Sequence, residues 1–251
     1  MKSALVPIEK LKEEPYASIL CYPRASNSEL RKRLRELQRL DVKAIEFHGK
    51  KQVFNVPVLG KGCVGIVTIA YVNSEKIAMK IRRVDADRSG LRQEAKMLSK
   101  ANSARVGPKL LAVSKNFLMM QFIDGDLLPE WLERHRAKRR IRRVLRDVLE
   151  QCRRLDESGL DHGELSHAPK HLIIDRHEKP FIVDFETASI SRKPSNVTSV
   201  CQFLFIGSAV AKIIAEKLGE KDRQLFIQAL RFYKIKRTRE NFRRILKLCL
   251  L

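Results

Sequence analysis

Three residues of this chain have the types that chemistry on phosphate groups requires. Glu164 follows a His-Gly pair, Asp184 begins an Asp-Phe-Glu tripeptide, and Lys80 lies near the end of an apolar run. Phosphoryl transfer uses one carboxylate to orient or deprotonate the attacking hydroxyl, a second to hold a divalent cation, and a lysine against the phosphates. We therefore expect Glu164, Lys80 and Asp184 to be catalytic, with Asp184 also a metal ligand. The alternative is that Asp184 caps a turn and that the loop around Glu164 is structural.

A glycine-rich segment precedes Lys80. Gly60, Gly62 and Gly65 lead directly into a β-branched run, residues 66–72, and not into a helix. A Walker loop ends in Gly-Lys-Ser/Thr and opens a helix, and a Rossmann fingerprint also opens a helix, so the segment fits neither. Glycines that introduce a strand can cover phosphates, as in protein kinases, or can simply belong to a hairpin.

The elements that position Lys80 follow from the local pattern. A turn at residues 73–75 separates two strands, so the glycines stand at the head of an antiparallel hairpin. A helix from about Ser89 to Ala101 carries Glu94 among apolar residues, which suits Glu94 to pair with Lys80. A further hairpin is expected from residues 109–113 and 117–123, with a hinge at 121–125.

Beyond the hinge the pattern is mainly helical. An apolar stripe with helical spacing runs from Ile141 to Leu155, and Gly159 is placed as its C-terminal cap, so this helix delivers the loop that carries Glu164. More helices are expected at about 197–218, 223–233 and 240–248. At the N-terminus, Asn27 or Ser28 can cap a helix with leucines at helical spacing.

Composition indicates a globular protein with buried cores. The chain has 251 residues, 44% of them hydrophobic, enough for one large domain or two small ones. Its five cysteines contain no CxxC pair, so we expect neither a zinc site nor a disulfide framework, but reduced, buried thiols. The longest apolar region, Val200 to Ala215, is interrupted by Gln202 and Lys212. We expect no membrane association and a cytoplasmic location.

The chain is strongly basic. Its 51 Lys and Arg against 29 Asp and Glu give a formal net charge of +22. Much of this charge lies in two clusters, residues 136–146 and 231–244. Such a field favours polyanions, and an RNA or ribonucleoprotein partner is one interpretation. The other is that these are solvated helix faces of a charge-rich protein.

From about Phe47 to Leu218, the chain resembles the protein kinase-like superfamily in the types and the order of these residues. The resemblance is strongest to a group of small archaeal predicted serine/threonine kinases related to the RIO kinases and the KEOPS-complex kinase. It implies an α+β, bilobal protein kinase-like fold. Residues 47–122 would form an N-lobe of antiparallel sheet with one helix, residues 123–251 a reduced helical C-lobe, and residues 1–46 an N-terminal helical extension.

The resemblance also assigns site residues. Gly60, Gly62, Gly65 and Val67 would cover or contact the nucleotide. Lys80, paired with Glu94, would contact its phosphates. The adenine pocket would be bordered by Met120, Gln121 and Ile123. Glu164 stands where the family has its catalytic Asp, and Asp184 where it has its magnesium ligand.

Three departures from the family pattern concern catalysis. Glu164 has one methylene more than Asp, which moves the carboxylate by about 1.5 Å. Pro169 stands where the family has a metal-binding Asn; if this loop contains a two-residue insertion, His171 takes that place as metal ligand or as nucleotide contact. Imidazole is a poor ligand for Mg²⁺ and an acceptable one for Mn²⁺. Glu186 replaces the Gly of Asp-Phe-Gly.

The resulting hypothesis is an atypical ATP-dependent kinase that transfers the γ-phosphate to Ser or Thr of a protein or of itself, with Mg²⁺ or Mn²⁺. One alternative is an ATP-binding pseudokinase with an RNA or ribonucleoprotein partner. Another is a small-molecule kinase, because a Glu at the position of Glu186 is also found in small-molecule kinases and because the short segment between Glu186 and the next expected helix leaves no room for a peptide-docking platform.

Overall fold

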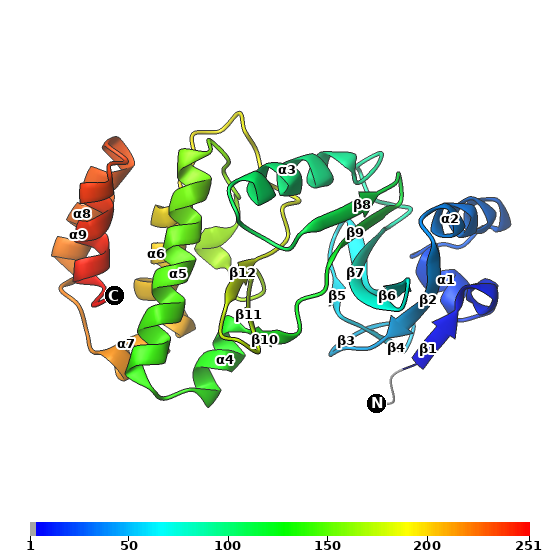
Figure 1. Ribbon diagram of the computed structural model, residues 1–251, viewed down its shortest axis with the longest axis horizontal. Coiled ribbons are helices and arrows are strands. Elements are labelled where there is room, and N and C mark those ends of the chain that lie inside the picture. Colours follow the sequence, from blue (N-terminus) through cyan, green and yellow to red (C-terminus); the bar gives the residue numbers. More distant parts are fainter. Residues whose placement is uncertain (1–3) are drawn as a thin grey trace. The chain divides into compact units, whose positions relative to one another are not determined.

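The computed structural model describes residues 4–251 (Figure 1). The chain divides into two compact units. The first comprises the residues up to Lys96 together with Lys109–Phe122, and the second comprises Met97–Pro108 together with Ile123–Leu251. The domain limits expected from the sequence stay predictions.

The first unit is built on an antiparallel sheet. Within residues 4–251 this sheet has seven strands, in the order β1-β2-β6-β7-β9-β8, with β5 paired to β6. The central strands β6 and β7 are buried over most of their length, which explains their nearly continuous apolar sequences. The strands of this unit are β1 (Ala4–Pro7), β2 (Val42–Phe47), β3 (Lys51–Val53), β4 (Val56–Val58), β5 (Gly60–Lys61), β6 (Gly65–Val72), β7 (Glu75–Arg82), β8 (Leu110–Val113) and β9 (Phe117–Gln121).

The two hairpins expected from the sequence are present. Val72 pairs with Glu75, so the β6–β7 turn consists of Asn73 and Ser74, both with positive φ (49° and 66°). Positive φ at both central residues is the geometry that matches the twist of a two-residue hairpin, and Asn adopts it readily. β8 pairs with β9 in the second hairpin. The helix between the hairpins, α3 (Arg92–Ser103), begins about one turn later than expected.

The N-terminal segment was expected to be a helical extension, and the structure corrects this. Besides η1 (Ile8–Lys12), α1 (Tyr16–Leu20) and α2 (Asn27–Arg39), it contributes strands β1 and β2 to the sheet. The α2 cap is Ser26, whose side chain accepts a hydrogen bond from the backbone N of Glu29. Neither Asn27 nor Ser28 is the cap.

A buried arginine connects α2 to the rest of the first unit. Arg33 is fully buried, and its Nη1 donates hydrogen bonds to the backbone oxygens of Leu20 (2.6 Å) and Arg82 (2.5 Å). On the same helix, Glu36 accepts hydrogen bonds from Ser114 and Asn116 in the β8–β9 turn. The N-terminal segment is therefore part of the first unit's core.

The second unit combines a small sheet with helices. Within the described residues, its sheet has three strands, β10 (Gly125–Leu127), β11 (Leu172–Asp175) and β12 (Pro180–Ile182), in that order. The helical elements are α4 (Leu128–Arg134), α5 (Lys138–Glu157), η2 (Leu165–His167), α6 (Asn196–Phe205), α7 (Ala209–Leu218), α8 (Arg223–Ile235) and α9 (Arg239–Leu248).

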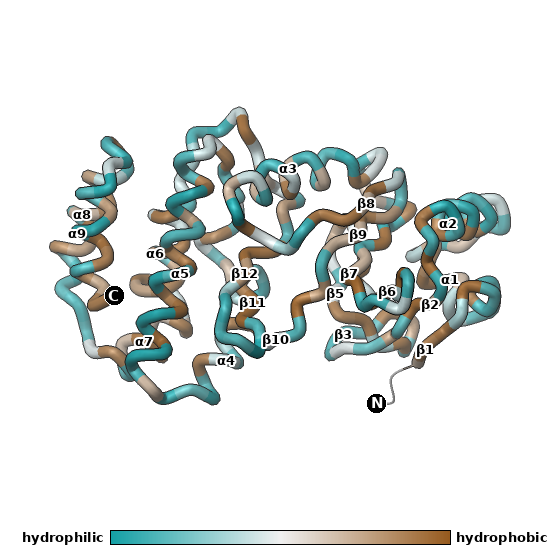
Figure 2. The backbone as a smooth tube through the Cα atoms, in the orientation of Figure 1, coloured by the Kyte–Doolittle hydropathy of each residue, from teal (hydrophilic) through white to brown (hydrophobic). Residues whose placement is uncertain are grey.

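Helix α5 has the apolar stripe that its sequence indicates. The stripe residues from Ile141 to Leu155 are all buried, and Figure 2 shows hydrophobic and hydrophilic segments alternating along the helix. Gly159 follows with a φ of 73°, the left-handed conformation of a helix C-terminal cap. The predicted support for the loop that carries Glu164 is thus confirmed.

The single helix expected at 197–218 is two helices. Ser208 caps α7 by accepting a hydrogen bond from the backbone N of Ala211 at 3.0 Å, and it donates one to the backbone oxygen of Phe203. These bonds satisfy backbone groups where the helix is interrupted. Within residues 4–251 no single helix is long and apolar enough to cross a membrane; α6 and α7 pass that test only together, and they are bent by 73°.

The cysteines agree with the sequence prediction except at one position. All five lie within residues 4–251 and are free thiols, and Cys21, Cys152, Cys201 and Cys249 are buried. Cys63, in the glycine-rich segment, is exposed. The expectation that all five are buried was therefore wrong for Cys63, which lies in the connection between two paired strands.

Candidate active site

In the first unit, three predicted site residues lie in one row across neighbouring strands. Gly60 of β5 is paired with Val67 of β6, and Val67 is paired with Lys80 of β7. Residues that are directly paired in an antiparallel sheet present their side chains on the same face. The structure thus brings Gly60, Val67 and Lys80 together.

The three glycines differ in whether the packing of the chain leaves room for a side chain at their positions. A Cβ atom at Gly65 would lie 2.9 Å from the backbone oxygen of Ile81 and from Cγ of Lys80, so the hairpin needs glycine there. Within the described chain, a Cβ at Gly60 or Gly62 would meet no atom closer than 3.5 Å. Packing of the chain therefore does not explain these two glycines, and the space beside them is open to a ligand.

Lys80 and Glu94 form a buried ion pair, as predicted. Lys80 Nζ lies 3.0 Å from Oε1 and 2.9 Å from Oε2 of Glu94, and the two residues are only 5% and 4% exposed. Leu91 and Ala95 of the same segment pack with Leu118 of β9. Because burying two charges offsets much of their attraction, such a pair adds little to stability. What it does is hold the ammonium group in one place on a rigid sheet.

The residues predicted to border an adenine pocket have different surroundings. Met120 of β9 is half-buried and is paired with Ala78, two residues from Lys80, so it lies on the same face as Lys80. Gln121 is exposed, and its Oε1 accepts a hydrogen bond from the backbone N of Lys109 at 3.2 Å. Ile123 belongs to the second unit and is half-buried just before β10.

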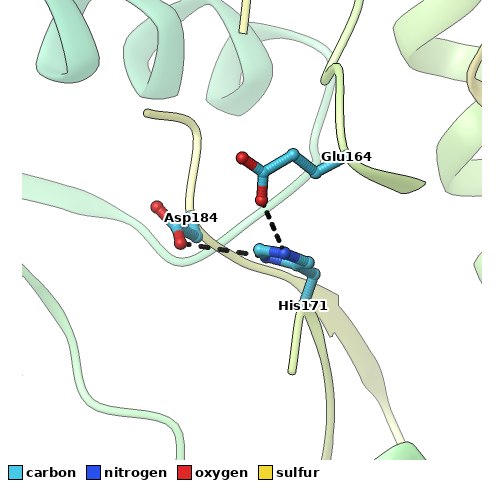
Figure 3. Close-up of side chains that lie close together, drawn as sticks. All are labelled: Glu164, His171 and Asp184. Atoms are coloured by element: carbon cyan, nitrogen blue, oxygen red, sulfur yellow. Dashed lines mark ion pairs between the residues drawn. The ribbon is translucent and has the colours of Figure 1, made fainter. Parts of the chain in front are cut away.

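In the second unit, Glu164, His171 and Asp184 converge (Figure 3). His171 immediately precedes β11, Asp184 follows β12, and Glu164 precedes η2. Nε2 of His171 lies 2.8 Å from Oε2 of Glu164, and its Nδ1 lies 3.9 Å from Oδ2 of Asp184. One ligand atom from each residue lies within 4.8 Å of the others. Pro169, at the family's Asn position, is exposed.

The imidazole of His171 is buried and can accept a cation. Its side chain is 1% exposed, and neither ring nitrogen makes a hydrogen bond of good geometry to any residue from 4 to 251. Burial lowers the pKa of His171, although Asp184 and Glu164 oppose the shift, so the neutral ring is favoured. Buried polar atoms normally have partners. A neutral imidazole facing two carboxylates is a donor set that fits a divalent cation.

Asp184 sits in an unusual backbone conformation held by its neighbours. Its φ is 68°, which is uncommon for a residue other than glycine. His162 donates from Nε2 to the backbone oxygen of Val183 at 3.1 Å and lies edge-on to the buried ring of Phe185. Burial, with a contribution from His171, lowers the pKa of His162 to about 4. His162 is therefore neutral at pH 7, and it contacts the residues on both sides of Asp184, Val183 and Phe185.

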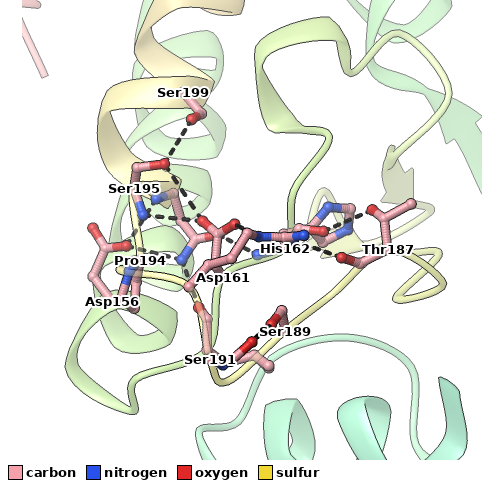
Figure 4. A network of polar contacts seen from close by, with 12 residues as sticks. Asp156, Asp161, His162, Thr187, Ser189, Ser191, Pro194, Ser195 and Ser199 are labelled. Atoms are coloured by element: carbon pink, nitrogen blue, oxygen red, sulfur yellow. Dashed lines mark hydrogen bonds and ion pairs between the residues drawn. The ribbon is translucent and has the colours of Figure 1, made fainter. Parts of the chain in front are cut away.

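A buried polar network fixes the start of the loop that carries Glu164 (Figure 4). Asn196 donates from Nδ2 to Asp156 Oδ1 (2.8 Å) and to the backbone oxygen of Leu160 (2.7 Å), and its Oδ1 accepts from the backbone N of His162 (2.8 Å). Burial raises the pKa of Asp156. The sequence reasoning missed both residues. The sequence did contain a signal for Asp156. It lies four residues after Cys152, on the apolar face of α5, where an acidic residue is unexpected.

Gly163 and Arg192 join the two loops of the site. Gly163 has a φ of 92°, and a Cβ there would lie 2.6 Å from Nη2 of Arg192 and 2.9 Å from Oγ1 of Thr187. Arg192 donates from Nε to Asp161 Oδ2 (2.9 Å) and from Nη2 to the backbone oxygen of Thr187 (2.7 Å). The segment after Asp184 is thereby tied to the loop of Glu164. Arg192 was not predicted from the sequence.

Comparison with known proteins places part of the chain in a family. Residues 69–199, slightly more than half of the chain, match the RIO domain. This segment includes Lys80, Glu94, Glu164, His171 and Asp184, whereas the glycine-rich segment precedes it. The chain is also 32% identical over 100 residues to the uncharacterized protein MJ1211 of Methanocaldococcus jannaschii, covering 40% of this chain and 84% of that protein.

The match bears on both fold and activity. It confirms the α+β, protein kinase-like fold expected from the sequence, with its antiparallel sheet and helices. A RIO domain implies an atypical, ATP-binding phosphotransferase that uses a divalent metal ion. The chain therefore belongs to the RIO family of atypical, protein kinase-like proteins.

Proposed function

We propose that this chain is an ATP-dependent kinase that transfers the γ-phosphate to a Ser or Thr hydroxyl of a protein or of itself. The observation that carries the proposal is the buried Lys80–Glu94 pair, with Lys80 Nζ 3.0 and 2.9 Å from the two carboxylate oxygens. A fixed ammonium group on a sheet, beside open glycines, is suited to the α- and β-phosphates of a nucleotide.

The remaining site residues have distinct roles in this proposal. Gly60 and Gly62 leave the backbone accessible to phosphates, and Gly65 allows the close approach of Lys80 to β6. Val67 and Met120 offer apolar surface on the face of Lys80. Asp184 and His171 would hold the metal ion, and Glu164 would orient the acceptor hydroxyl. A bound Mg²⁺ or Mn²⁺ would neutralise charge on the phosphate oxygens.

Phosphate transfer is the direct test. Purified protein is incubated with γ-labelled ATP and Mg²⁺ or Mn²⁺, with and without generic protein substrates. We expect label on Ser or Thr in wild type and none in Asp184→Ala. ATP binding without any transfer or hydrolysis would reject the proposal in favour of a pseudokinase, and a labelled small molecule without labelled protein would favour a small-molecule kinase.

Nucleotide binding is tested separately by thermal shift. ATP with Mg²⁺ or Mn²⁺ should stabilise the wild type, by about 2.7 kcal/mol when the ligand is at a hundred times its Kd. Lys80→Ala should lose this stabilisation. Lys96→Ala, an exposed lysine on α3, is the matched control and should keep it. No nucleotide-dependent stabilisation of wild type would contradict every kinase-like function.

A second candidate function is binding of RNA or a ribonucleoprotein, alone or together with ATP. Exposed basic residues gather on and before α5, and again on α8, directly after α8 and on α9. They are Arg136, Lys138, Arg139, Arg140, Arg143 and Arg146 in the first group, and Arg231, Lys234, Lys236, Arg243, Arg244 and Lys247 in the second. In the first group Glu178 pairs with Arg140 and Arg143, which leaves an excess of positive charge.

Salt dependence distinguishes this candidate from a solvated surface. If the basic groups release counterions from RNA, the logarithm of affinity should fall linearly with the logarithm of salt concentration. Reversing Arg231, Arg243 and Arg244 to Glu should reduce both affinity and slope. Binding too weak to measure at low salt would reject the candidate and leave the kinase proposal intact.

A further inference from the structure

The two departures of the catalytic loop from the family pattern contact each other. Glu164 stands in place of an Asp, and with a two-residue insertion in this loop His171 takes the place of the Asn. Their side chains meet, with Nε2 of His171 2.8 Å from Oε2 of Glu164. Asp184 lies on the other side of the same ring, 3.9 Å from Nδ1.

We propose that Glu164, His171 and Asp184 form one three-residue site for a divalent first-row transition metal ion such as Mn²⁺, in preference to Mg²⁺. The inference rests on the proposed function and deepens it by naming the metal class. It also gives Glu164 a second role, because one carboxylate oxygen binds the cation and the other is left for the acceptor hydroxyl.

Burial supports a ligand role for the imidazole. His171 is 1% exposed and both its ring nitrogens lack a well-formed hydrogen bond within residues 4–251, although they face two carboxylates. The side chains of Glu164 and Asp184 are 38% and 34% exposed, so a cation can enter from solvent. Three protein ligands leave further coordination positions to water or phosphate oxygens.

The chemistry of the donors sets the preference. Mg²⁺ takes oxygen ligands in near-ideal octahedral geometry and loses its water reluctantly. Imidazole suits transition ions, and a site of one imidazole and two carboxylates accepts them with less demanding geometry. The net charge of +22 disfavours nonspecific cation binding elsewhere on the surface. Tight binding of Mn²⁺ would therefore report on this cluster.

The test uses the full chain and Mn²⁺ without nucleotide. Electron paramagnetic resonance measures the Mn²⁺ affinity from loss of the free-ion signal, and its pulsed form detects coupling to a ligand nitrogen nucleus. We expect one tight Mn²⁺ with nitrogen coupling, displaced by Mg²⁺ only at large excess. His171→Asn should abolish the coupling, weaken Mn²⁺ by about tenfold or more, and lower the ratio of Mn²⁺ to Mg²⁺ affinity.

Two further variants separate the roles of the residues. Glu164→Asp keeps the charge but shortens the side chain, and should weaken Mn²⁺ binding; unchanged binding would remove Glu164 from the ligand set. His167→Asn changes an exposed histidine three residues after Glu164 and should alter neither affinity nor coupling. This control shows that any effect of His171→Asn is local.

The results that overturn the inference do not depend on the variants folding. Absence of nitrogen coupling in wild type, or equal affinity for Mn²⁺ and Mg²⁺, would remove His171 from the ligand set and overturn the inference. If ATP still stabilises that protein, only the metal inference fails. If Mn²⁺ binds with nitrogen coupling but ATP never stabilises the protein, the proposed kinase function fails.

Discussion

Arg83 contacts the glycine-rich segment through Gly62, whose backbone oxygen accepts a hydrogen bond from Nη1 of Arg83 at 3.1 Å. The backbone N of Arg83 also donates to the backbone oxygen of Val64 at 2.8 Å. Its guanidinium lies 5.0 Å from the ring centre of Tyr22, and Lys61 Nζ lies 4.8 Å from the same ring. The N-terminal segment and the end of β7 thus brace the glycines from one side.

Replacing Arg83 should weaken nucleotide binding and lower the free energy of unfolding by no more than about 1.5 kcal/mol. A hydrogen bond of this kind contributes about 0.5–1.5 kcal/mol, so Arg83→Ala should raise the Kd for ATP about two- to tenfold. The side chain's ion pair with the exposed Asp85 adds little to folding. Calorimetric titration with ATP and with adenosine checks the prediction. Because adenosine has no phosphates, its affinity should fall less than that of ATP. Lys43→Ala, which breaks the exposed pair with Asp41, is the control.

Breaking the Lys80–Glu94 pair should destabilise the first unit more than removing both charges. Glu94→Leu leaves a buried ammonium group without its carboxylate and should cost about 3–5 kcal/mol of unfolding free energy. The double variant Lys80→Met with Glu94→Leu should recover much of this. Urea unfolding measures the difference. If the single and double variants lost the same free energy of unfolding, the attraction between the two charges would not be what the single variant removes.

Arg33 should be essential for attaching α2 to the sheet. Arg33→Met leaves the backbone oxygens of Leu20 and Arg82 buried without this donor, and each such loss costs about 1–3 kcal/mol. Arg31→Met, at an exposed position on the same helix, should change stability by less than about 0.5 kcal/mol. Chemical denaturation compares the two. Similar values for both variants would contradict the structural role of Arg33.

Stability should fall with acid between about pH 6.5 and pH 4 because of His162. Its pKa is about 4 in the folded chain, below the ordinary value of 6.5, so the unfolded chain binds the proton first as pH falls. Above pH 6.5, His162 is neutral in both states and no stability is lost. Below pH 4 it is protonated in both states, and the free energy of unfolding is lower by roughly 3 kcal/mol because the charged imidazole is buried. His162→Gln should flatten the curve in urea unfolding across this range, although His171, whose pKa is also lowered, keeps part of the slope.

Local patterns determined the elements on which the site is built. The Asn73-Ser74 turn between two apolar runs, the stripe from Ile141 to Leu155 and the cap at Gly159 each reflect contacts within a few turns or residues, so their sequences alone predicted them. The pairing of Lys80 with Glu94 could be predicted because strand and helix follow each other closely and the order of motifs resembled a known family.

Only the tertiary structure decided the contacts between distant segments. Strands β1 and β2 are short, and their place in the sheet depends on pairing between separate segments, because β1 pairs with β2 and β2 pairs with β6. The bond between Asp156 and Asn196 and the meeting of Glu164 with His171 and Asp184 arise where separate loops are held together. Periodicity shows which face of an element is buried but not what covers it. The sequence thus determined that this chain carries the residues for phosphate chemistry, and the fold decided that a buried imidazole lies between its two acids.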